Sequence, residues 1–276
     1  MSTKVVLLGT GSPSCQPHSF QSSSAVVVGE RPFIIDCGGG TVQRISQAIA
    51  NGQSQLQFNN IGDLILTHLH PDHTSGLADF IITTWVLRRF KTLNIYGPKG
   101  TAKMVNLLVE AYELGIAEHQ RAEFPNADTL RLQVIEYTSG PLIQDEHVTV
   151  TAFDVSHGGL ESYGLKFETA DKTVVFSGDT KPHPNIIQHA QNCDLLIHEC
   201  YSEVGLHQSH FSVSYFRRMH TSTQELAEIA NQSKPKKLII THKMHLSDIS
   251  DASFVDEIKQ KYDGVVLMGQ DLEVFQ

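Results

Sequence analysis

Cysteine is scarce in this chain, with four residues among 276 and no C-x-x-C pair. Zinc knuckles and disulfide-stapled scaffolds both need closely spaced cysteines, so neither class fits the sequence. No apolar run approaches the roughly 18 residues of a membrane-spanning helix. The first residues form a short apolar stretch without a small-residue cleavage site, which is not the pattern of a secretory signal. These absences predict a reduced, cytoplasmic protein with no membrane partner.

Positive charge is also in short supply, with 21 Lys and Arg residues against 30 Asp and Glu residues and a net charge of −9. A dedicated nucleic-acid binder usually carries an excess of basic residues. Two short basic clusters, at residues 88–91 and 234–237, are more typical of solvated surface. The composition therefore argues against nucleic acid as the main partner, but leaves it open as an alternative.

Strand-like apolar runs alternate with helical stretches along the whole chain. The expected strands are residues 4–9, 25–28, 33–36, 63–67, 93–96, 132–137, 148–155, 162–168, 173–177, 194–198, 237–241, 265–267 and 272–275. The expected helices are residues 41–51, 77–90, 99–114 and 223–232. No repeat, low-complexity tract or long linker interrupts this pattern. We therefore predict one domain of α/β class over residues 1–276.

Histidine is abundant, with fifteen residues, and one short segment concentrates metal-ligand side chains. His68 and His70 follow an expected strand, so on an extended backbone they point the same way. Pro71 ends that extended segment, and Asp72 and His73 then face another direction from a loop before a helix. Ligands on two fronts indicate two adjacent metal ions rather than one.

Two metal ions need further ligands, since each zinc takes about four. His157, Asp179 and His242 each come at or just after the end of an expected apolar strand. Strand ends are where α/β folds gather functional side chains. We therefore expect these three residues to complete the two sites, although each taken singly could be an ordinary loop or core residue.

This set of seven side chains resembles the ligands of the metallo-β-lactamase superfamily. Asp36, in the run Phe33-Ile34-Ile35-Asp36-Cys37-Gly38, is similar to an early aspartate motif of that family, which lies outside the metal ligands. The resemblance extends from the Gly-Thr-Gly at residues 9–11 to His242 and implies a four-layer αββα sandwich. It also implies that His68, His70 and His157 hold one metal, that Asp72, His73 and His242 hold the other, and that Asp179 bridges them. Zinc is the expected metal, with manganese and iron as alternatives.

Two further motifs are similar to those of ribonuclease Z proteins. They are Leu195-Leu196-Ile197-His198-Glu199-Cys200, which resembles a "HEAT" motif, and Met219-His220-Thr221-Ser222-Thr223, which resembles an "HST" loop. The resemblance implies that His220 and Glu199 form a catalytic pair near the leaving group. The interval from His157 to Asp179 is short and filled by expected strands, which leaves no room for the arm that grips tRNA in ribonuclease Z. In this the chain looks more like arm-less relatives, such as arylsulfatase-like and cyclic-nucleotide phosphodiesterase-like hydrolases.

The expected activity is hydrolysis of a phosphodiester, a sulfate ester or a related small-molecule ester by a metal-bound hydroxide. Asp72 would orient the attacking water or take its proton, and His220, held by Glu199, would protonate the leaving group. The alternatives are a ribonuclease Z-type tRNA 3′-end endonuclease and a metal-binding regulatory protein with slow turnover. A homodimer is compatible with the resemblance, because dimers are common in that family. Specificity is expected in residues 53–60, 84–92, 115–128 and 201–220.

Overall fold

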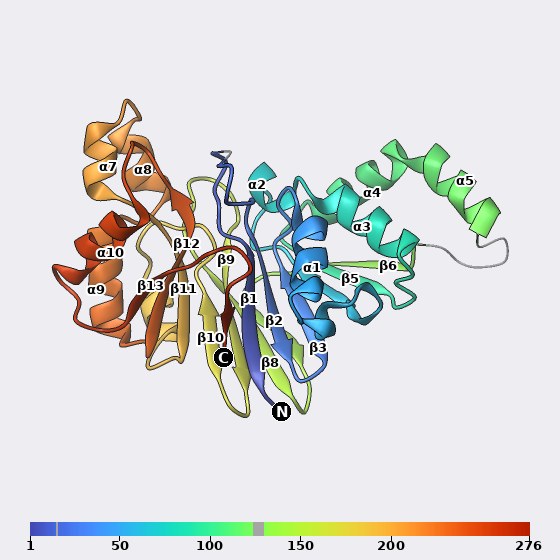
Figure 1. Ribbon diagram of the computed structural model, residues 1–276, viewed down its shortest axis with the longest axis horizontal. Helices are drawn as coiled ribbons and strands as arrows, with labels where there is room; N and C mark the ends of the chain where they lie inside the picture. Colours follow the sequence, from blue (N-terminus) through green and yellow to red (C-terminus); the bar gives the residue numbers. More distant parts are fainter. Residues whose placement is uncertain (15, 124–129) are drawn as a thin grey trace.

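The computed structural model describes residues 1–14, 16–123 and 130–276. Within this part of the chain, two seven-stranded sheets lie face to face and helices cover their outer faces (Figure 1). This arrangement confirms the αββα sandwich that the sequence resemblance implied. The last strand, β14 (Val274–Phe275), pairs antiparallel with the first, β1 (Thr3–Gly9), so the two ends of the chain lie close together.

The first sheet comes from the N-terminal half of the chain, with β14 added at its edge. Its order is β14-β1-β2-β3-β4-β5-β6. The strands after β1 are β2 (Ser23–Val28), β3 (Arg31–Ile35), β4 (Asp63–Ile65), β5 (Leu93–Gly97) and β6 (Leu132–Glu136). Strands β3 to β6 run parallel. Parallel neighbours need crossover connections, and these contain α1 (Thr41–Ala50), α3 (Leu77–Val86), α4 (Thr101–Ala111) and α5 (Glu113–Glu123).

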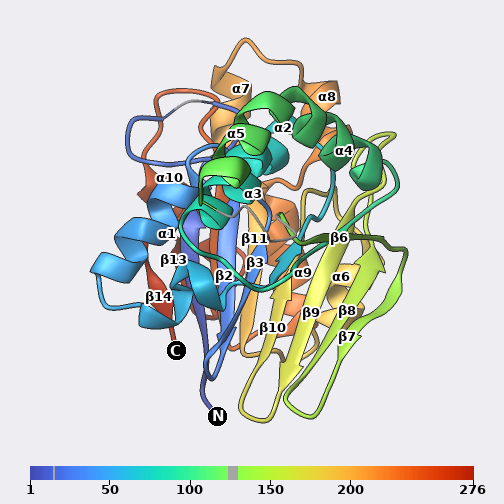
Figure 2. The same ribbon diagram turned by 90° about the vertical axis from the view of Figure 1, so that its right-hand side faces the viewer.

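The second sheet has the order β13-β12-β11-β10-β9-β8-β7. Its antiparallel half, β7 (Gly140–Gln144), β8 (Val148–Asp154), β9 (Tyr163–Thr169) and β10 (Thr173–Phe176), faces the viewer in Figure 2. Its parallel half continues with β11 (Leu195–Tyr201), β12 (Lys237–Met244) and β13 (Val266–Met268). The connections here contain α6 (Pro184–His189), α7 (Glu203–Gln208), α8 (Val213–Met219), α9 (Thr223–Ser233) and α10 (Asp251–Lys259).

Strand β2 shows how the sequence fixes the layers. All six of its residues are buried. Val26 and Val28 face the core between the sheets, whereas Ala25 and Val27 face the layer beneath the helices. A strand covered on both faces reads as a continuous apolar run rather than an alternating one. Each fully buried valine contributes about 1.5–3 kcal/mol relative to an exposed one, so the helix layers are needed for the sandwich to be stable.

The expected elements are present with small shifts at their ends, but several predictions were wrong. The helix expected over residues 99–114 ends at Ala111, and α5 follows at once, so Gly115 lies inside a helix instead of ending one. The helix expected over residues 77–90 ends at Val86. Strand β7 and helices α6, α7, α8 and α10 were not predicted. Most of these elements are short or polar. Helix α5, which also lies outside the predicted helices except at its start, buries only Ile116, so its hydrophobic period is weak.

The topology directs functional side chains to one edge of the sandwich. Parallel strands of both sheets end there, at the top of Figure 1, where α2 (Pro71–Thr74) and α8 lie. Cys37, Cys193 and Cys200 are buried free thiols, and the remaining cysteine, Cys15, lies outside the described residues. Across the described ranges, every helix is too short or too polar to cross a membrane.

Candidate metal centre

Four of the expected ligands follow β4. The strand ends at Ile65, and an irregular segment leads to α2, which begins at Pro71. Proline is favoured at this first helical position, because its missing N–H would have no partner there. Asp72 and His73 therefore lie in a short helix, and the prediction of a loop was wrong. The turn still separates them from His68 and His70, which remain on the preceding segment.

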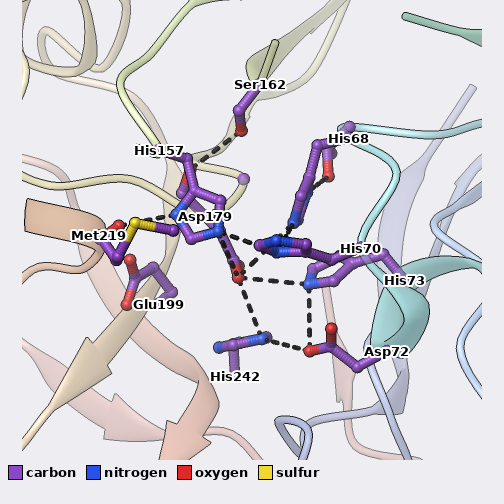
Figure 3. Close-up of polar contacts among 12 residues, drawn as sticks. His68, His70, Asp72, His73, His157, Ser162, Asp179, Glu199, Met219 and His242 are labelled. Carbon is purple, nitrogen blue, oxygen red and sulfur yellow. Dashed lines mark hydrogen bonds and ion pairs between the residues drawn. The ribbon is translucent and has the colours of Figure 1, made fainter. Parts of the chain in front are cut away.

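The first centre consists of His68, His70, His157 and Asp179, whose ligand atoms all lie within 4.8 Å of one another. His70 Nδ1 lies 3.2 Å from His68 Nε2 and 3.0 Å from His157 Nε2 (Figure 3). Asp179 Oδ2 lies 3.8 Å from His68 Nε2 and 3.9 Å from His157 Nε2. Ligand atoms 2.0–2.1 Å from a tetrahedral zinc are about 3.3 Å apart, so this spacing suits such an ion.

The second centre consists of Asp72, His73, His242 and Asp179. His242 Nε2 lies 3.0 Å from Asp72 Oδ2 and 3.2 Å from Asp179 Oδ2. His73 Nε2 lies 3.6 Å and 3.4 Å from the same two oxygens. Among the described residues, His73 Nε2 and His242 Nδ1 are buried without a hydrogen-bond partner. A buried imidazole nitrogen without a partner, facing two carboxylates, fits a divalent cation, and Asp179 Oδ2 is common to both centres.

Neighbouring oxygens orient the histidine rings from behind. His157 Nδ1 lies 2.8 Å from the carbonyl oxygen of Met219, which can only accept, so Nδ1 carries the proton and Nε2 is free for a metal. His73 Nδ1 likewise donates to Asp36 Oδ2 at 2.8 Å. Such outer partners fix the tautomer of a ligating histidine and raise its basicity. The sequence indicated Asp36, but a backbone carbonyl such as that of Met219 leaves no sequence signal.

Two residues of the site, the ligand candidate His242 and the supporting residue Asp36, depart from regular backbone. His242 has φ of 47°, in the left-handed region, and is the extra residue where the pairing of β12 with β11 shifts register. A bulge of this kind re-aims a side chain that regular pleating would send elsewhere. Asp36, with φ of 58°, follows β3 in the same unfavourable region. Its carboxylate accepts hydrogen bonds from the backbone N–H and the hydroxyl of Thr67, which hold it in place.

Burial and neighbouring charges shift the pKa values of the carboxylates and imidazoles in the two centres. Burial alone would raise the pKa of Asp179, but His242 and His73 hold it well below its ordinary value. Burial would lower the pKa of His73, yet Asp179 and Asp36 raise it well above its ordinary value. Burial lowers the pKa of His68 and of His157, so these imidazoles are neutral near pH 7. Ionised carboxylates and neutral imidazoles are the forms that bind divalent metals, so His73 would have to release its Nε2 proton when a cation binds.

Glu199 and His220 lie next to both centres. Glu199 is on β11, and His220 follows the last residue of α8. His220 Nδ1 lies 3.1 Å from Glu199 Oε1, which also accepts the backbone N–H of Thr180 at 3.0 Å. Burial and Asp179 raise the pKa of Glu199 well above its ordinary value. Cations bound at the adjacent centres would act in the opposite direction, favouring the carboxylate.

The structure brings together all the residues that the sequence singled out: His68, His70, Asp72, His73, His157, Asp179, His242, Glu199 and His220. The prediction that residues 53–60 and 84–92 govern specificity was wrong. Residues 53–60 and 84–92 lead into the amino ends of β4 and β5, opposite to the edge that carries the centres. Residues 115–123 form part of α5, and residues 124–128 lie outside the described residues. Among the described residues of these segments, those at 201–220 lie beside the centres, through Met219 and His220.

Comparison with known proteins agrees with the fold and the clusters. The fold and the paired His/Asp centres define a ribonuclease Z-like protein of the metallo-β-lactamase superfamily. The chain belongs to the family described as Anti-Pycsar protein Apyc1, whose model matches residues 3–261. Ribonuclease Z from Mycobacterium bovis (strain BCG / Pasteur 1173P2) is 32% identical over 248 residues, which cover 87% of this chain and 85% of that protein.

Two solved structures show the same fold over nearly their whole length. The metallo-beta-lactamase fold protein YhfI from Bacillus subtilis has a TM-score of 0.73 at 20% identity, covering 99% of this chain and 98% of that chain. The short form of human tRNase Z has a TM-score of 0.74 at 22% identity, with the same coverage. The ribonuclease Z relative is a hydrolase, so the chain is assigned to a hydrolase superfamily with clustered metal-binding side chains.

Proposed function

We propose that this protein is a dinuclear metal-dependent phosphodiesterase that acts on a small-molecule ester, with zinc as the expected metal. One observation carries the proposal: two four-residue centres share Asp179, and the His220–Glu199 pair lies directly beside them. The first centre would hold one ion and the second centre the other. Divalent cations held there would supply the chemistry typical of such sites, a lowered pKa for water and stabilisation of negative charge on the ester oxygens.

Asp72 and His220 would handle the protons. Asp72 Oδ2 is buried and lies 3.0 Å from His242 Nε2, so it is placed to orient a nucleophilic water or to accept its proton. Glu199 binds His220 through Nδ1, so His220 would act as the acid in its imidazolium form, supported by the Glu199 carboxylate, and give the Nε2 proton to the departing alcohol. Burial lowers the pKa of His220, whereas Asp179 and Asp72 favour the imidazolium. The two groups lie on different elements, α2 and the end of α8, as acid and base acting on opposite ends of a displacement require.

A tRNA 3′-end endonuclease is the second candidate, because the similar mycobacterial protein is named ribonuclease Z. Two observations disfavour it. The net charge is −9, and β9 and β10 fill the interval from His157 to Asp179, so no arm is inserted there. A sulfate ester remains a variant of the first proposal, since the same groups could act at sulfur. A metal-binding regulator with slow turnover is a third candidate, and the intact His220–Glu199 pair disfavours it. The free thiols accord with a cytoplasmic setting.

The test is a panel of hydrolysis assays on metal-loaded protein. It contains bis-p-nitrophenyl phosphate, p-nitrophenyl sulfate, 2′,3′- and 3′,5′-cyclic nucleotides and a pre-tRNA, each beside the Asp179→Ala variant, with metal content measured for both proteins. Turnover of small phosphodiesters, lost together with metal in the variant, supports the proposal. Cleavage of pre-tRNA in preference to small esters would establish the second candidate. A fully metallated protein that turns over nothing would refute both and favour a regulatory role.

A further inference from the structure

The segment between β11 and α9 leaves the second sheet and forms α7 and α8 above it (Figure 1). Its end is attached to the first centre, because His157 Nδ1 donates to the carbonyl oxygen of Met219 at 2.8 Å. His220 follows directly. Thr221 then donates its hydroxyl to the carbonyl oxygen of Thr180 at 2.7 Å, next to Asp179 in the chain. The position of α8 is therefore fixed relative to the catalytic groups.

Tyr215 lies on the side of α8 that faces the loop after His157. Residues four apart in a helix share a face, so Tyr215 lies above Met219. Met219 packs against Gly158, because a Cβ atom at Gly158 would lie 2.6 Å from Met219 Sδ. The ring of Tyr215 is 6.5 Å from the ring of His220, which is 5.0 Å from that of His157. His220 is therefore next to a ring of the first centre and next to Tyr215.

Tyr215 on α8 and Phe211, which precedes α8, are exposed although they belong to an aromatic cluster. We call these two residues the α8 aromatic pair. Their exposed fractions are 44% and 56%. Both rings contact Phe216, which is buried and also contacts His220 and Tyr201. Packing on Phe216 supports the two exposed rings from behind and restricts their movement. Exposed apolar patches can mark ligand-binding surfaces.

We propose that the α8 aromatic pair binds a planar aromatic group, an aryl ring or a nucleobase, on the leaving side of the ester. His220 gives its proton to the leaving oxygen, so the group attached to that oxygen extends past His220. Tyr215 is the exposed ring next to it, at a distance typical of interacting aromatic rings. Tyr215 thus acts as a specificity-determining residue, with Phe211 enlarging the same surface. This inference rests on the proposed function, because it assumes an ester whose leaving group His220 protonates.

The test is calorimetric binding of matched ligands to the metal-loaded protein, which needs no turnover. One pair is phenylphosphonate and methylphosphonate, and the other is adenosine 5′-monophosphate and ribose 5-phosphate. Within each pair only the planar ring differs. Loss of a stacking partner typically costs about 5- to 100-fold in affinity. The variants are Tyr215→Ala, Tyr215→Phe and Phe211→Ala, with Phe90→Ala as control, because Phe90 is also 56% exposed but precedes β5 at the opposite edge.

We expect the ring-bearing ligand of at least one pair to bind more tightly, and Tyr215→Ala to remove that advantage by about 5- to 100-fold. Tyr215→Phe and Phe90→Ala should keep it, and methylphosphonate should bind equally to all variants. An advantage in the first pair alone identifies an aryl group, and one in the second pair identifies a nucleobase. If methylphosphonate binds but the ring-bearing ligands bind no more tightly, the inference of an aromatic site is overturned. The same holds if the ring-bearing ligand keeps its tighter binding in Tyr215→Ala and in Phe211→Ala. In either case the proposed function is not affected.

Two further results would also overturn the inference. If no phosphonate or phosphate binds a fully metallated protein, the proposed function fails and the aromatic site fails with it. If light scattering shows a dimer that Tyr215→Ala converts to a monomer, the α8 aromatic pair contacts a second copy of the chain instead of a ligand.

Discussion

Removing the proton donor gives the most direct test of the proposed chemistry. His220→Ala should lower kcat by roughly 10²- to 10⁴-fold, the usual contribution of general acid catalysis. This corresponds to about 3–5 kcal/mol of barrier. Glu199→Gln keeps an oxygen for the backbone N–H of Thr180 but loses the charge that supports His220. A hydrogen bond to a charged group contributes about 1.5–3 kcal/mol, so this variant should lose roughly 10- to 150-fold.

The structure also predicts how these two losses combine. Glu199 acts on the leaving group only through His220 Nδ1, so the double variant should be no slower than His220→Ala alone. The loss of kcat in His220→Ala should depend on the leaving group. It should be large for an alcohol, which needs a proton to depart, and small for p-nitrophenolate, which departs as an anion. The control is His207→Ala, because His207 lies on α7 and contacts Glu203 at the surface.

Steady-state kcat should be measured on diesters with the two kinds of leaving group, at equal metal content for every variant. Equal losses on p-nitrophenolate and alcohol leaving groups would refute the assignment of His220 as the acid. Additive losses in the double variant would refute the view that Glu199 works through His220. Loss of metal from Glu199→Gln would place that carboxylate among the ligands, since its oxygen lies within 4.8 Å of ligand atoms of His220 and His242.

Three other predictions concern stability. Removing metal with a chelator should lower Tm by roughly 5–10 °C, because an ion at 100 times its Kd stabilises by about 2.7 kcal/mol; an unchanged Tm in calorimetry would contradict metal binding. Hydrogen bonds from Thr3 outweigh partial burial and lower the pKa of Asp171 to about 2 from 3.8. Asp171→Asn should therefore cost about 1 kcal/mol at pH 7, a difference in the free energy of unfolding that should shrink below about pH 4 and vanish only well below pH 2, as urea unfolding would show. Glu257 accepts from the hydroxyls of Ser202 and Thr223 at both ends of the α7–α8 segment. Glu257→Ala should destabilise by about 2–4 kcal/mol and lower kcat at unchanged metal content, whereas a variant with normal kcat would show that His220 needs no such anchor.

The clusters that could hold metal ions were predictable because metal-binding chemistry depends on residue type and spacing. The run from His68 to His73 concentrates ligands that few other structures would need, and Asp179 and His242 sit at the ends of recognisable apolar strands. The bulge at His242 could not be predicted, because it depends on how β12 pairs with β11. Neither could the hydrogen bond from His157 to Met219, since any residue supplies a carbonyl oxygen.

The errors have a common physical cause. Helix α5 buries only Ile116, so its hydrophobic period is weak and tertiary contacts decide its structure. Strand β7 is short and half-buried, which gives little alternation to detect. Residues 53–60 and 84–92 were predicted to be loops. Residues 54–56 and 58–60 instead form short 3-10 helices, and residues 84–86 end α3, so the prediction is correct for residues 87–92. Sequence alone does not tell which edge of a sheet a connection occupies. That requires the strand direction, and in both cases the connection enters the amino end of a parallel strand.

The distribution of ligands between the two sheets gives the strongest reason to regard the centres as functional. The segment after β4 in the first sheet supplies His68 to His73, and the second sheet supplies His157, Asp179 and His242. Asp179 Oδ2 lies within 4 Å of four imidazole nitrogens, which come from both sheets. Burying so many ionisable groups together opposes folding unless cations compensate the carboxylates. Apolar residues would join the sheets at lower cost, as they do below this edge, so the cluster is better explained by the chemistry that two shared cations allow than by any contribution to the core.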